Sequence, residues 1–413
     1  MKVVIAGPFG SGALADEAVL AGLLRHLGRK HEITVLSQNP DRTEALHQVQ
    51  AETLAKPKDL LASPEAWHAL SQAHLLVLCG AGVLSERGTM PARVWLSMLE
   101  HACRVEVKTA VMGVGALPVE NKQESIRLQR LLHNFTAGIS VRDEQSKQAL
   151  VSYGLSPGLV SANGDLALAL ATGAEARWKP KNQRVGLIFS EQLPSRDGFG
   201  FEERRAAPAL VQATQAWLSA LLASCPHEVV IFHDDTPSAA EAVAIIRSAA
   251  SPGRVQAQPA NLAPGMLQKD LANCAACFSF TLHGLMLSAT CGVPAAGLEA
   301  ETGASRFLAA LGQGRSAVAC RDGAFEVEAA LKEMHALLEG EAALSALVTQ
   351  KIGVLTRKET QNARMLEYLV PRRERREKNG KFENDESDES DEKEGKYRND
   401  EKYRKQGKYG KKD

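Results

Sequence analysis

The stretch that decides the expected fold is residues 277–297, which read CFSFTLHGLMLSATCGVPAAG. Its pattern predicts an apolar strand, a short polar turn, a small apolar helix and a second strand, over residues 275–280, 281–284, 285–290 and 295–298. Gly292 and Pro294 lie where the helix is expected to end, because glycine adopts the left-handed conformation and proline cannot continue a helix. This order of elements is typical of a parallel sheet covered by helices.

His283 falls at the predicted turn between this strand and this helix. In parallel sheets, ligands bind where strands end and helices begin, because the first helical turn presents unpaired N–H groups and a positive dipole. Histidine is also the side chain that titrates near neutral pH. The position therefore predicts a proton donor or an anion ligand. A buried histidine that only caps the helix is the alternative interpretation.

The beginning of the chain shows a related pattern. Residues 2–6 predict a strand buried on both faces, residues 7–12 (GPFGSG) a tight loop, and residues 16–27 a helix. The loop resembles a dinucleotide-binding fingerprint, but its glycine spacing is GxxGxG rather than GxGxxG. In addition, Ser37 and not an acidic residue ends the second predicted strand. We therefore do not expect NAD to bind.

Further predicted strands also end in glycine or charged residues. They lie at 73–79, 108–112, 137–141, 159–163, 184–190 and 228–233. Strand ends of this kind line a ligand crevice at the carboxyl edge of a doubly wound sheet. The expected fold class is α/β, with two Rossmann-like domains facing a central cleft. The expected order is a first domain, a linker, a second domain, a C-terminal helix that could pack on the first domain, and a charged tail, over residues 1–172, 173–182, 183–340, 341–370 and 371–413.

The composition excludes several classes of function. The chain has 413 residues with 49 Lys and Arg against 49 Asp and Glu, so no basic field predicts nucleic-acid binding. Seven scattered cysteines suggest no disulfide framework, and no histidine and cysteine cluster predicts a metal site. The sequence shows neither a signal peptide nor an apolar run of about 18 residues. We therefore expect a cytoplasmic protein without a membrane span.

The last stretch, residues 371–413, contains 15 Lys and Arg, 13 Asp and Glu and only four aromatic side chains. Such a segment cannot bury enough apolar surface to offset the entropy lost on ordering, so we expect it to be disordered. Its charges lie in blocks of opposite sign. The tail is therefore the candidate for a peripheral contact with a membrane or another protein, and a merely solvated tail is the alternative.

Several short motifs follow one another along the chain. They are Gly7, Gly10 and Gly12 with Asp16, Glu17, Ala18 and Leu20; GAGVL at 80–84; GVG at 113–115; ISVRDEQS at 139–146; Asp165; and SFTLHG at 279–284 with GVP at 292–294. In this order they resemble the polysaccharide pyruvyl transferase family. The resemblance implies a GT-B-like fold and transfer of a pyruvyl group from phosphoenolpyruvate to a sugar, which forms a ketal. The acceptor would belong to a cell-surface glycan or its precursor, as in exopolysaccharide biosynthesis.

On the matching positions, the resemblance implies that His283 is the general acid and base. It implies no metal and no cofactor, phosphoenolpyruvate being a co-substrate, and a substrate site formed by Arg142, Asp16, Gly10, Gly12, Gly82, Gly115, Ser279, Thr281 and Gly284. Asp16 would orient a sugar hydroxyl, although the helix dipole also favours an acidic residue in a first turn. The acceptor, a glycan or lipid-linked sugar, is expected at loops 85–91 and 192–200.

Thr281 departs from the family pattern SxRLHG, in which an arginine stands at this position. A guanidinium offers a bidentate fork to a carboxylate or phosphate, whereas threonine offers one hydroxyl. Arg142 keeps its motif and is the expected anion clamp. An ordinary ion pair of Arg142 with Asp143 or Glu144 is the alternative. Arg306 could replace the missing arginine in space.

Two other functions stay open at this point. One is a glycosyltransferase that uses a nucleotide-sugar on the same architecture. The other is a non-catalytic relative that binds a glycan or a partner protein.

Overall fold

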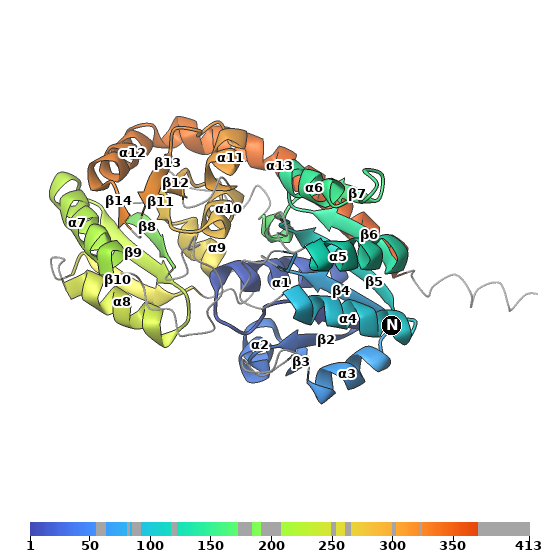
Figure 1. Ribbon diagram of the computed structural model, residues 1–413. Coiled ribbons are helices and arrows are strands. Elements are labelled where there is room, and N and C mark those ends of the chain that lie inside the picture. Colours follow the sequence, from blue (N-terminus) through green and yellow to red (C-terminus); the bar gives the residue numbers. More distant parts are fainter. Residues whose placement is uncertain are drawn as a thin grey trace, which may run out of the picture. The chain divides into compact units, whose positions relative to one another are not determined.

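The computed structural model describes most of the chain (Figure 1). The described residues are 1–54, 63–80, 83–84, 92–116, 122–171, 184–190, 208–248, 253–260, 266–299, 303–321 and 324–370. Met1–Pro371 form one compact unit and Arg372–Asp413 a second. The charged tail, the linker at 173–182, the two acceptor loops and Gly82 lie outside the described residues, so the expectations for them stay predictions.

The first half of the compact unit is built on a seven-stranded sheet with the order β3-β2-β1-β4-β5-β6-β7. All of its pairs are parallel. The strands are β1 (Lys2–Ala6), β2 (Glu32–Ser37), β3 (Gln50–Thr53), β4 (Leu75–Cys79), β5 (Lys108–Val114), β6 (Thr136–Val141) and β7 (Val160–Ala162). The helices are α1 (Leu14–Leu27), α2 (Pro40–His47), α3 (Pro64–Ser71), α4 (Ala92–Arg104), α5 (Lys122–Phe135), α6 (Glu144–Ser152) and the short η1 (Leu166–Leu170).

The second half repeats this arrangement with the order β10-β9-β8-β11-β12-β13-β14. Its pairs are parallel except for β13 with β14, which is antiparallel. The strands are β8 (Arg184–Phe189), β9 (Glu228–His233), β10 (Val255–Pro259), β11 (Ala276–Ser279), β12 (Ala295–Glu299), β13 (Ala317–Arg321) and β14 (Ala324–Phe325). The helices are α7 (Pro208–Ser224), α8 (Pro237–Ser248), α9 (Met266–Leu271), α10 (Leu282–Thr290), α11 (Gly303–Ala310) and α12 (Val327–Glu339).

In both sheets, successive strands are added first on one side of the starting strand and then on the other, so each sheet has one topological switch point. In the first sheet it lies between β1 and β4, and in the second between β8 and β11. In doubly wound sheets, ligands bind outside the carboxyl ends of the strands at this switch point. The glycine-rich loop that follows β1 and the segment that follows β11 are therefore the two places where the topology favours a site.

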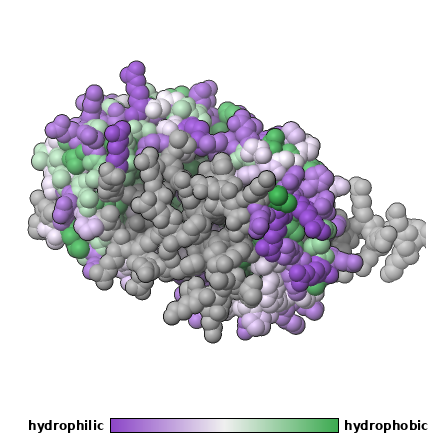
Figure 2. All heavy atoms as spheres, in the orientation of Figure 1, coloured by the Kyte–Doolittle hydropathy of each residue, from purple (hydrophilic) through white to green (hydrophobic). Residues whose placement is uncertain are grey.

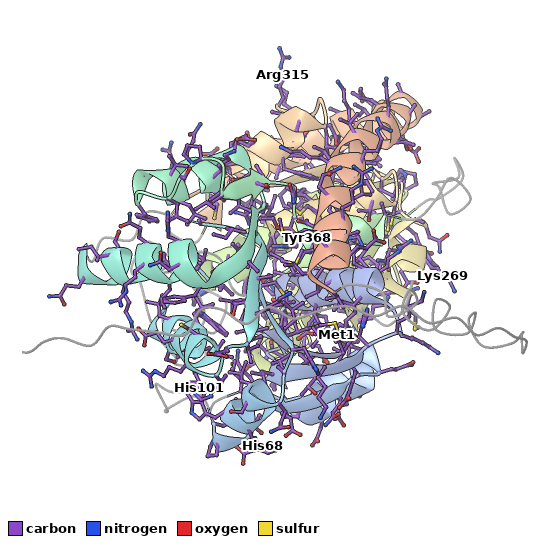
Figure 3. All side chains as sticks on the ribbon, turned by 90° about the vertical axis from the view of Figure 1, so that its right-hand side faces the viewer. Met1, His68, His101, Lys269, Arg315 and Tyr368 are labelled. Carbon is purple, nitrogen blue, oxygen red and sulfur yellow. The ribbon has the colours of Figure 1, made fainter. Side chains whose placement is uncertain are left out.

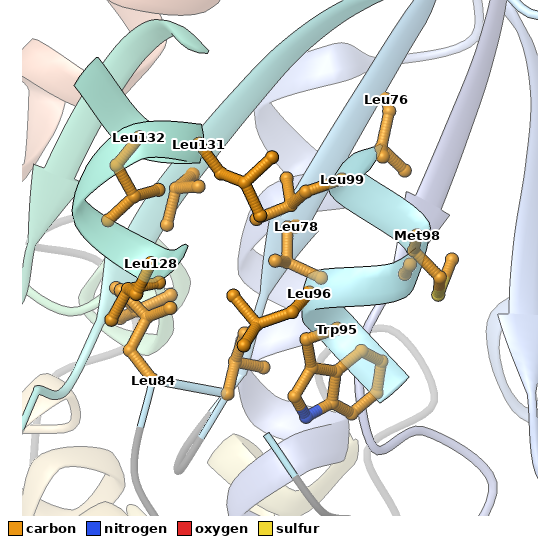
Figure 4. Packing of buried hydrophobic residues seen from close by; sticks show 14 of the residues in the cluster. Leu76, Leu78, Leu84, Trp95, Leu96, Met98, Leu99, Leu128, Leu131 and Leu132 are labelled. Carbon is orange, nitrogen blue, oxygen red and sulfur yellow. The ribbon is translucent and has the colours of Figure 1, made fainter. Parts of the chain in front are cut away.

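Helices cover both faces of the first sheet, and its central strands β1 and β4 are nearly uninterrupted apolar runs, as expected for strands buried on both faces. Along β1, Val4 and Ala6 pack in one cluster with α3, α4 and α5. Val3 and Ile5 point the other way and pack with α1 and the end of α13. Figure 4 shows part of the first cluster, where side chains of α4 and α5 pack over β4.

A long C-terminal helix, α13 (Glu341–Leu369), contacts elements of both halves (Figure 1). Val348 and Ile352 pack in a cluster with α10 of the second half. Leu366 and Leu369 pack in the cluster that covers one face of the first sheet. The helix therefore fixes elements of the second half against elements of the first.

The turn predicted at residues 281–284 is wrong, because α10 already begins at Leu282. Thr281 is its N-cap: the backbone is extended, with φ −127° and ψ 150°, and Oγ1 accepts a hydrogen bond from the N–H of Gly284 at 3.1 Å. Threonine at this position is a helix start signal. His283 therefore lies in the first turn of the helix. The predicted helix end is confirmed, since Gly292 adopts a φ of 74° after the last turn.

Gly22 of α1 lies against η1, where a Cβ at position 22 would be 1.9 Å from the carbonyl oxygen of Leu166. Gly22→Ala should therefore lower the free energy of unfolding by about 1–3 kcal/mol, because overpacking outweighs the better helix propensity of alanine. Urea denaturation measures the change. The matched control is Gly353→Ala in α13, where only the end of Arg357 lies within 4 Å. This control should stabilise by about 0.5–1 kcal/mol. Equal effects of the two substitutions would contradict the close contact of α1 with η1.

Candidate active site

The centre of the site is a buried pair formed by His283 and Asp165. The Nε2 atom of His283 lies 3.2 Å from Oδ2 of Asp165, and the two side chains are only 4% and 2% exposed. Asp165 follows β7 in the first half and caps η1, accepting a hydrogen bond from the N–H of Ala167 at 2.9 Å. His283 comes from the second half, so the pair joins the two halves.

Asp165 stays ionised in spite of its burial. Desolvation acts to raise the pKa of its carboxyl, but His283 lowers it by charge and by hydrogen bonding, and Arg142 and the N–H of Ala167 lower it further. The net result is a pKa below the usual aspartate value. A carboxylate held ionised at 3.2 Å from the imidazole fixes the orientation of the ring and stabilises positive charge on it.

Two guanidinium groups meet at one carboxylate beside this pair. Nε of Arg142 lies 3.3 Å from Oδ2 of Asp143, and a terminal nitrogen of Arg306 on α11 lies 3.8 Å from the same oxygen. Asp143 also caps α6 through the N–H of Ser146 at 2.7 Å. Burial raises the pKa of Asp143, but Arg142, the Ser146 hydrogen bonds and Arg306 lower it more, so that it lies below its usual value. The ion pair of Arg142 with Asp143 that the sequence suggested is thus present.

The positive charge of Arg142 also lowers the pKa of Asp165 in the central pair. A Cβ at Gly115 would lie 3.0 Å from a terminal nitrogen of Arg142. Glycine at position 115 therefore leaves the room that the guanidinium occupies. Arg306, on the opposite half, approaches the same carboxylate as Arg142. The site consequently holds two cations and a histidine within one connected group of side chains.

Ser279, Thr281 and Gly284 hold the turn that presents His283. Oγ of Ser279 accepts from the N–H of Thr281 at 3.2 Å and donates to its carbonyl oxygen at 2.9 Å. A Cβ at Gly284 would come within 2.2 Å of the same Oγ, so only glycine fits. These contacts explain, without any ligand, why Ser279, Thr281 and Gly284 occur at these positions. Their predicted roles in substrate binding stay predictions.

The glycine-rich loop after β1 is held from both halves. The N–H of Gly10 donates to Oε1 of Glu17 at 2.8 Å, and the other carboxylate oxygen of Glu17 lies 2.8 Å from Nε2 of His47. The carbonyl oxygen of Gly12 accepts from the N–H of Asp235 at 3.1 Å. With φ of 79° and 85°, Gly10 and Gly12 adopt the left-handed conformation, which favours glycine. Both glycines therefore serve close backbone contacts, and their substrate role stays a prediction.

Asp16 is a buried acidic residue in the first turn of α1, and it is only 4% exposed. Burial raises the pKa of the Cys79 thiol, and the negative charges of Asp16 and then Asp165 raise it further, so both carboxylates act on one sulfur. The expected role of Asp16 in orienting a sugar hydroxyl stays a prediction.

Sequence reasoning missed the residues that join the halves around this site. Asp234, directly after β9, accepts a hydrogen bond from the N–H of Leu14 at 2.9 Å and one from the hydroxyl of Ser190 at 2.5 Å. Asp234 and Asp235 together therefore tie the second half to the start of α1 and to the glycine-rich loop. A charged residue at the end of a predicted strand was the available signal, but nothing in the sequence showed which loop it would meet.

A second missed group lies on α13. The side-chain oxygen of Asn362 accepts from Ser140 at 2.7 Å and from the amide of Asn163 at 3.1 Å, and its nitrogen donates to the carbonyl oxygen of Gly164 at 3.2 Å. One turn earlier, the fully buried Glu359 pairs with His26 of α1 at 2.7 Å. Because Gly164 directly precedes Asp165, the C-terminal helix fixes the backbone that presents this carboxylate.

The described residues contain no group of three or more His, Cys, Asp or Glu side chains arranged to hold a metal ion. Among the helices they form, none is long and apolar enough to cross a membrane.

Two Rossmann-like sheets with the same strand order define an α/β protein of the GT-B-like class. The chain belongs to the polysaccharide pyruvyl transferase family, a family of transferases, whose model matches residues 16–301. No curated protein sequence matches the chain.

Solved structures with a similar fold include HepE of Anabaena in complex with UDP and glucose, with a TM-score of 0.55 and 12% identity over 89% of this chain and 99% of that one. The UDP-GlcNAc 2-epimerase of Neisseria meningitidis, bound to UDP-GlcNAc, has a TM-score of 0.55 and 13% identity over 89% and 99%. The corresponding epimerase of Methanocaldococcus jannaschii has a TM-score of 0.57 and 11% identity over 89% and 100%. At these identities the likeness concerns the fold alone.

The hydroxyl of Thr281 caps α10, so removing it should destabilise the protein. We expect Thr281→Ala to lower the free energy of unfolding by about 1 kcal/mol, whereas Thr281→Ser should retain most of it, because serine supplies the same acceptor. Chemical denaturation of the two variants beside the wild type measures the difference. If alanine and serine at this position were equally stable, Thr281 would not act as the cap.

The depressed pKa of Asp165 gives a defined pH dependence. A carboxyl with a lower pKa in the folded state stabilises it above the unfolded value, and this contribution is lost as pH falls through the folded-state pKa, below about pH 4. In Asp165→Asn, the decline of the free energy of unfolding below about pH 4 should be shallower, by up to about 1.4 kcal/mol per pH unit. Urea denaturation across this range is the measurement. Asp41→Asn, at the exposed start of α2, is the control; an unchanged slope in Asp165→Asn would contradict the assignment.

Proposed function

We propose that the protein transfers a pyruvyl group from phosphoenolpyruvate to a sugar of a cell-surface glycan or its precursor, forming a ketal. The single observation that carries the proposal is the buried pair of His283 and Asp165 beside two guanidinium groups, those of Arg142 and Arg306. Family membership supports the class of reaction. A proton donor next to paired cations suits a substrate that bears both a carboxylate and a phosphate.

In the proposed reaction, Arg142 and Arg306 bind the anionic groups of phosphoenolpyruvate. In the absence of substrate, both arginines contact Asp143, and when the substrate binds they would exchange part of this contact for its anionic groups. Such exchange is inexpensive for a carboxylate that is about 30% exposed, because water already competes for it. In this proposal, Arg306 on the neighbouring helix α11 takes over the role of the arginine that the family pattern has at position 281.

His283 acts as the general acid. It donates a proton to the methylene carbon of phosphoenolpyruvate, which makes the adjacent carbon electrophilic. A sugar hydroxyl then attacks that carbon and passes its own proton back to the neutral imidazole of His283. A second hydroxyl then displaces inorganic phosphate and closes the ketal, and its proton leaves with the phosphate. Asp165 holds the imidazole in place and stabilises its protonated form during the first step.

The acceptor would approach from the glycine-rich loop after β1. Asp16, buried in the first turn of α1, is the proposed partner of a sugar hydroxyl. The acceptor is proposed to be a glycan or a lipid-linked sugar, in a cytoplasmic step of cell-envelope or exopolysaccharide synthesis.

One observation favours a second candidate, a relative that binds a ligand without pyruvyl transfer. Thr281 not only lacks a guanidinium but uses its hydroxyl as the cap of α10. HepE of Anabaena, similar in fold, was solved with UDP and glucose, which makes UDP the ligand to test for this alternative.

Calorimetric titration of the full chain with phosphoenolpyruvate and, separately, with UDP distinguishes the candidates. We expect phosphoenolpyruvate to bind the wild type, and Arg142→Ala to weaken binding by about tenfold to a hundredfold, since hydrogen bonds to charged groups contribute about 1.5–3 kcal/mol. Arg357→Ala, on the exposed side of α13, is the matched control and should bind like the wild type.

His283→Gln separates binding from chemistry, because glutamine can still donate a hydrogen bond to Asp165 but cannot transfer a proton. It should bind phosphoenolpyruvate and show no release of phosphate in the presence of glycan acceptors. Binding of UDP with no binding of phosphoenolpyruvate by the wild type would reject the pyruvyl transfer proposal in favour of the second candidate.

A further inference from the structure

An open groove of about 420 Å³ runs between α4 and α5, on the far side of the first sheet from η1 and α13. Its lining reaches from Gln123, near the start of α5, to Phe135, the last residue of that helix. At 1.5 Å per residue, the groove is therefore about 20 Å long. Figure 3 labels His101 on α4, which forms one wall of the groove, and Tyr368 on α13.

The charges along the groove are mainly positive. Arg104, Arg127 and Arg130 line it together with a single carboxylate, that of Glu100. Arg127 holds this carboxylate by two hydrogen bonds of 2.6 Å each, and these bonds, more than the nearby charges, keep the pKa of Glu100 below its usual value. Within the described part of the chain, no ion pair joins Arg104 or Arg130 to a carboxylate. Two exposed guanidinium groups therefore remain for an external anion.

Apolar side chains lie exposed at the same place. Ile126 is 55% exposed, Phe135 is 41% exposed, and Val105, directly after α4, is 36% exposed. Ile126 and Phe135 both line the groove, and the buried Leu131, a member of the cluster shown in Figure 4, forms part of its floor. On the side that carries α4 and α5, hydrophobic residues are set among hydrophilic ones (Figure 2). Exposed side chains of this size next to arginines are a feature of surfaces that meet lipid headgroups.

We propose that this groove docks the protein on the anionic surface of a lipid bilayer. Lipid phosphates would bind Arg104 and Arg130, and Ile126 and Phe135 would enter the boundary between headgroups and acyl chains. The length of the groove and its apolar floor suit a lipid better than a free phosphate ion, and the surplus of positive charge complements an anionic surface. The proposal stands independently of the reaction proposed above.

Co-sedimentation of the full chain with vesicles tests the proposal. The wild type should bind vesicles of phosphatidylcholine that contain phosphatidylglycerol, bind those of phosphatidylcholine alone far less, and lose binding as salt is added. Arg104→Glu with Arg130→Glu should lower the partition coefficient about tenfold or more, since each arginine near an anionic surface contributes roughly fivefold or more. Ile126→Ser with Phe135→Ser should also lower it.

The matched control is Val354→Ser with Arg357→Glu, which removes an exposed apolar side chain and reverses an exposed arginine on α13. This variant should bind like the wild type. Circular dichroism checks that each variant folds, and Arg104→Gln with Arg130→Gln replaces the charge reversal if that variant does not. The proposal is overturned if the wild type does not bind anionic vesicles, if the groove variants bind as well as the control, or if the groove binds an acidic peptide but not vesicles.

Discussion

The structure of the site depends on the buried contact between His283 and the carboxylate of Asp165. A carboxylate that is 2% exposed is stable only with a partner, since an unpaired buried charge costs several kcal/mol. The partner comes from the opposite half of the compact unit, so the pair forms only when the two halves are held in a fixed relative position. Asp234 and Asp235 hold the glycine-rich loop from the second half, and Asn362 of α13 holds the backbone just before Asp165.

The parallel topology explains why these groups meet. Each half has the same strand order, and each places its chemistry after a strand at the switch point: the glycine-rich loop after β1 and the segment with Thr281 and His283 after β11. Arg142 and Asp165 follow β6 and β7 at the same edge of the first sheet. Because parallel strands present their carboxyl ends at one edge, residues far apart in sequence converge without any special loop.

The sequence predicted much of this fold, because buried parallel strands appear as apolar runs with a distinct composition. The strands at 2–6 and 228–233 agree with β1 and β9, and the fold class is confirmed. The start of α10 was misplaced because Thr281 was interpreted as a turn residue and not as a cap. The amphipathic segments of α4 and α5 were not predicted at all. His283 was found from its place between strand and helix, whereas Asn362 and Asp234 were missed, because pairing across more than a hundred residues leaves no local pattern.

In the proposed site, the departure of Thr281 from the family pattern would be compensated by a residue elsewhere. Its hydroxyl satisfies the first turn of α10, and the cation expected at this place is absent from the side chain itself. Arg306 on α11 lies 3.8 Å from the carboxylate that Arg142 also contacts, and we propose that it supplies the missing positive charge from a different helix. On this account, the anion site is rearranged and still present.

The most direct test of this account is the histidine imidazole spectrum of the full chain, recorded by nuclear magnetic resonance during titration with phosphoenolpyruvate. The signal that is missing in His283→Gln identifies His283. We predict that this signal shifts on addition of phosphoenolpyruvate in the wild type and in Arg357→Ala, and that the shift requires a much higher concentration in Arg142→Ala. A His283 signal that does not respond to saturating phosphoenolpyruvate would contradict the central claim.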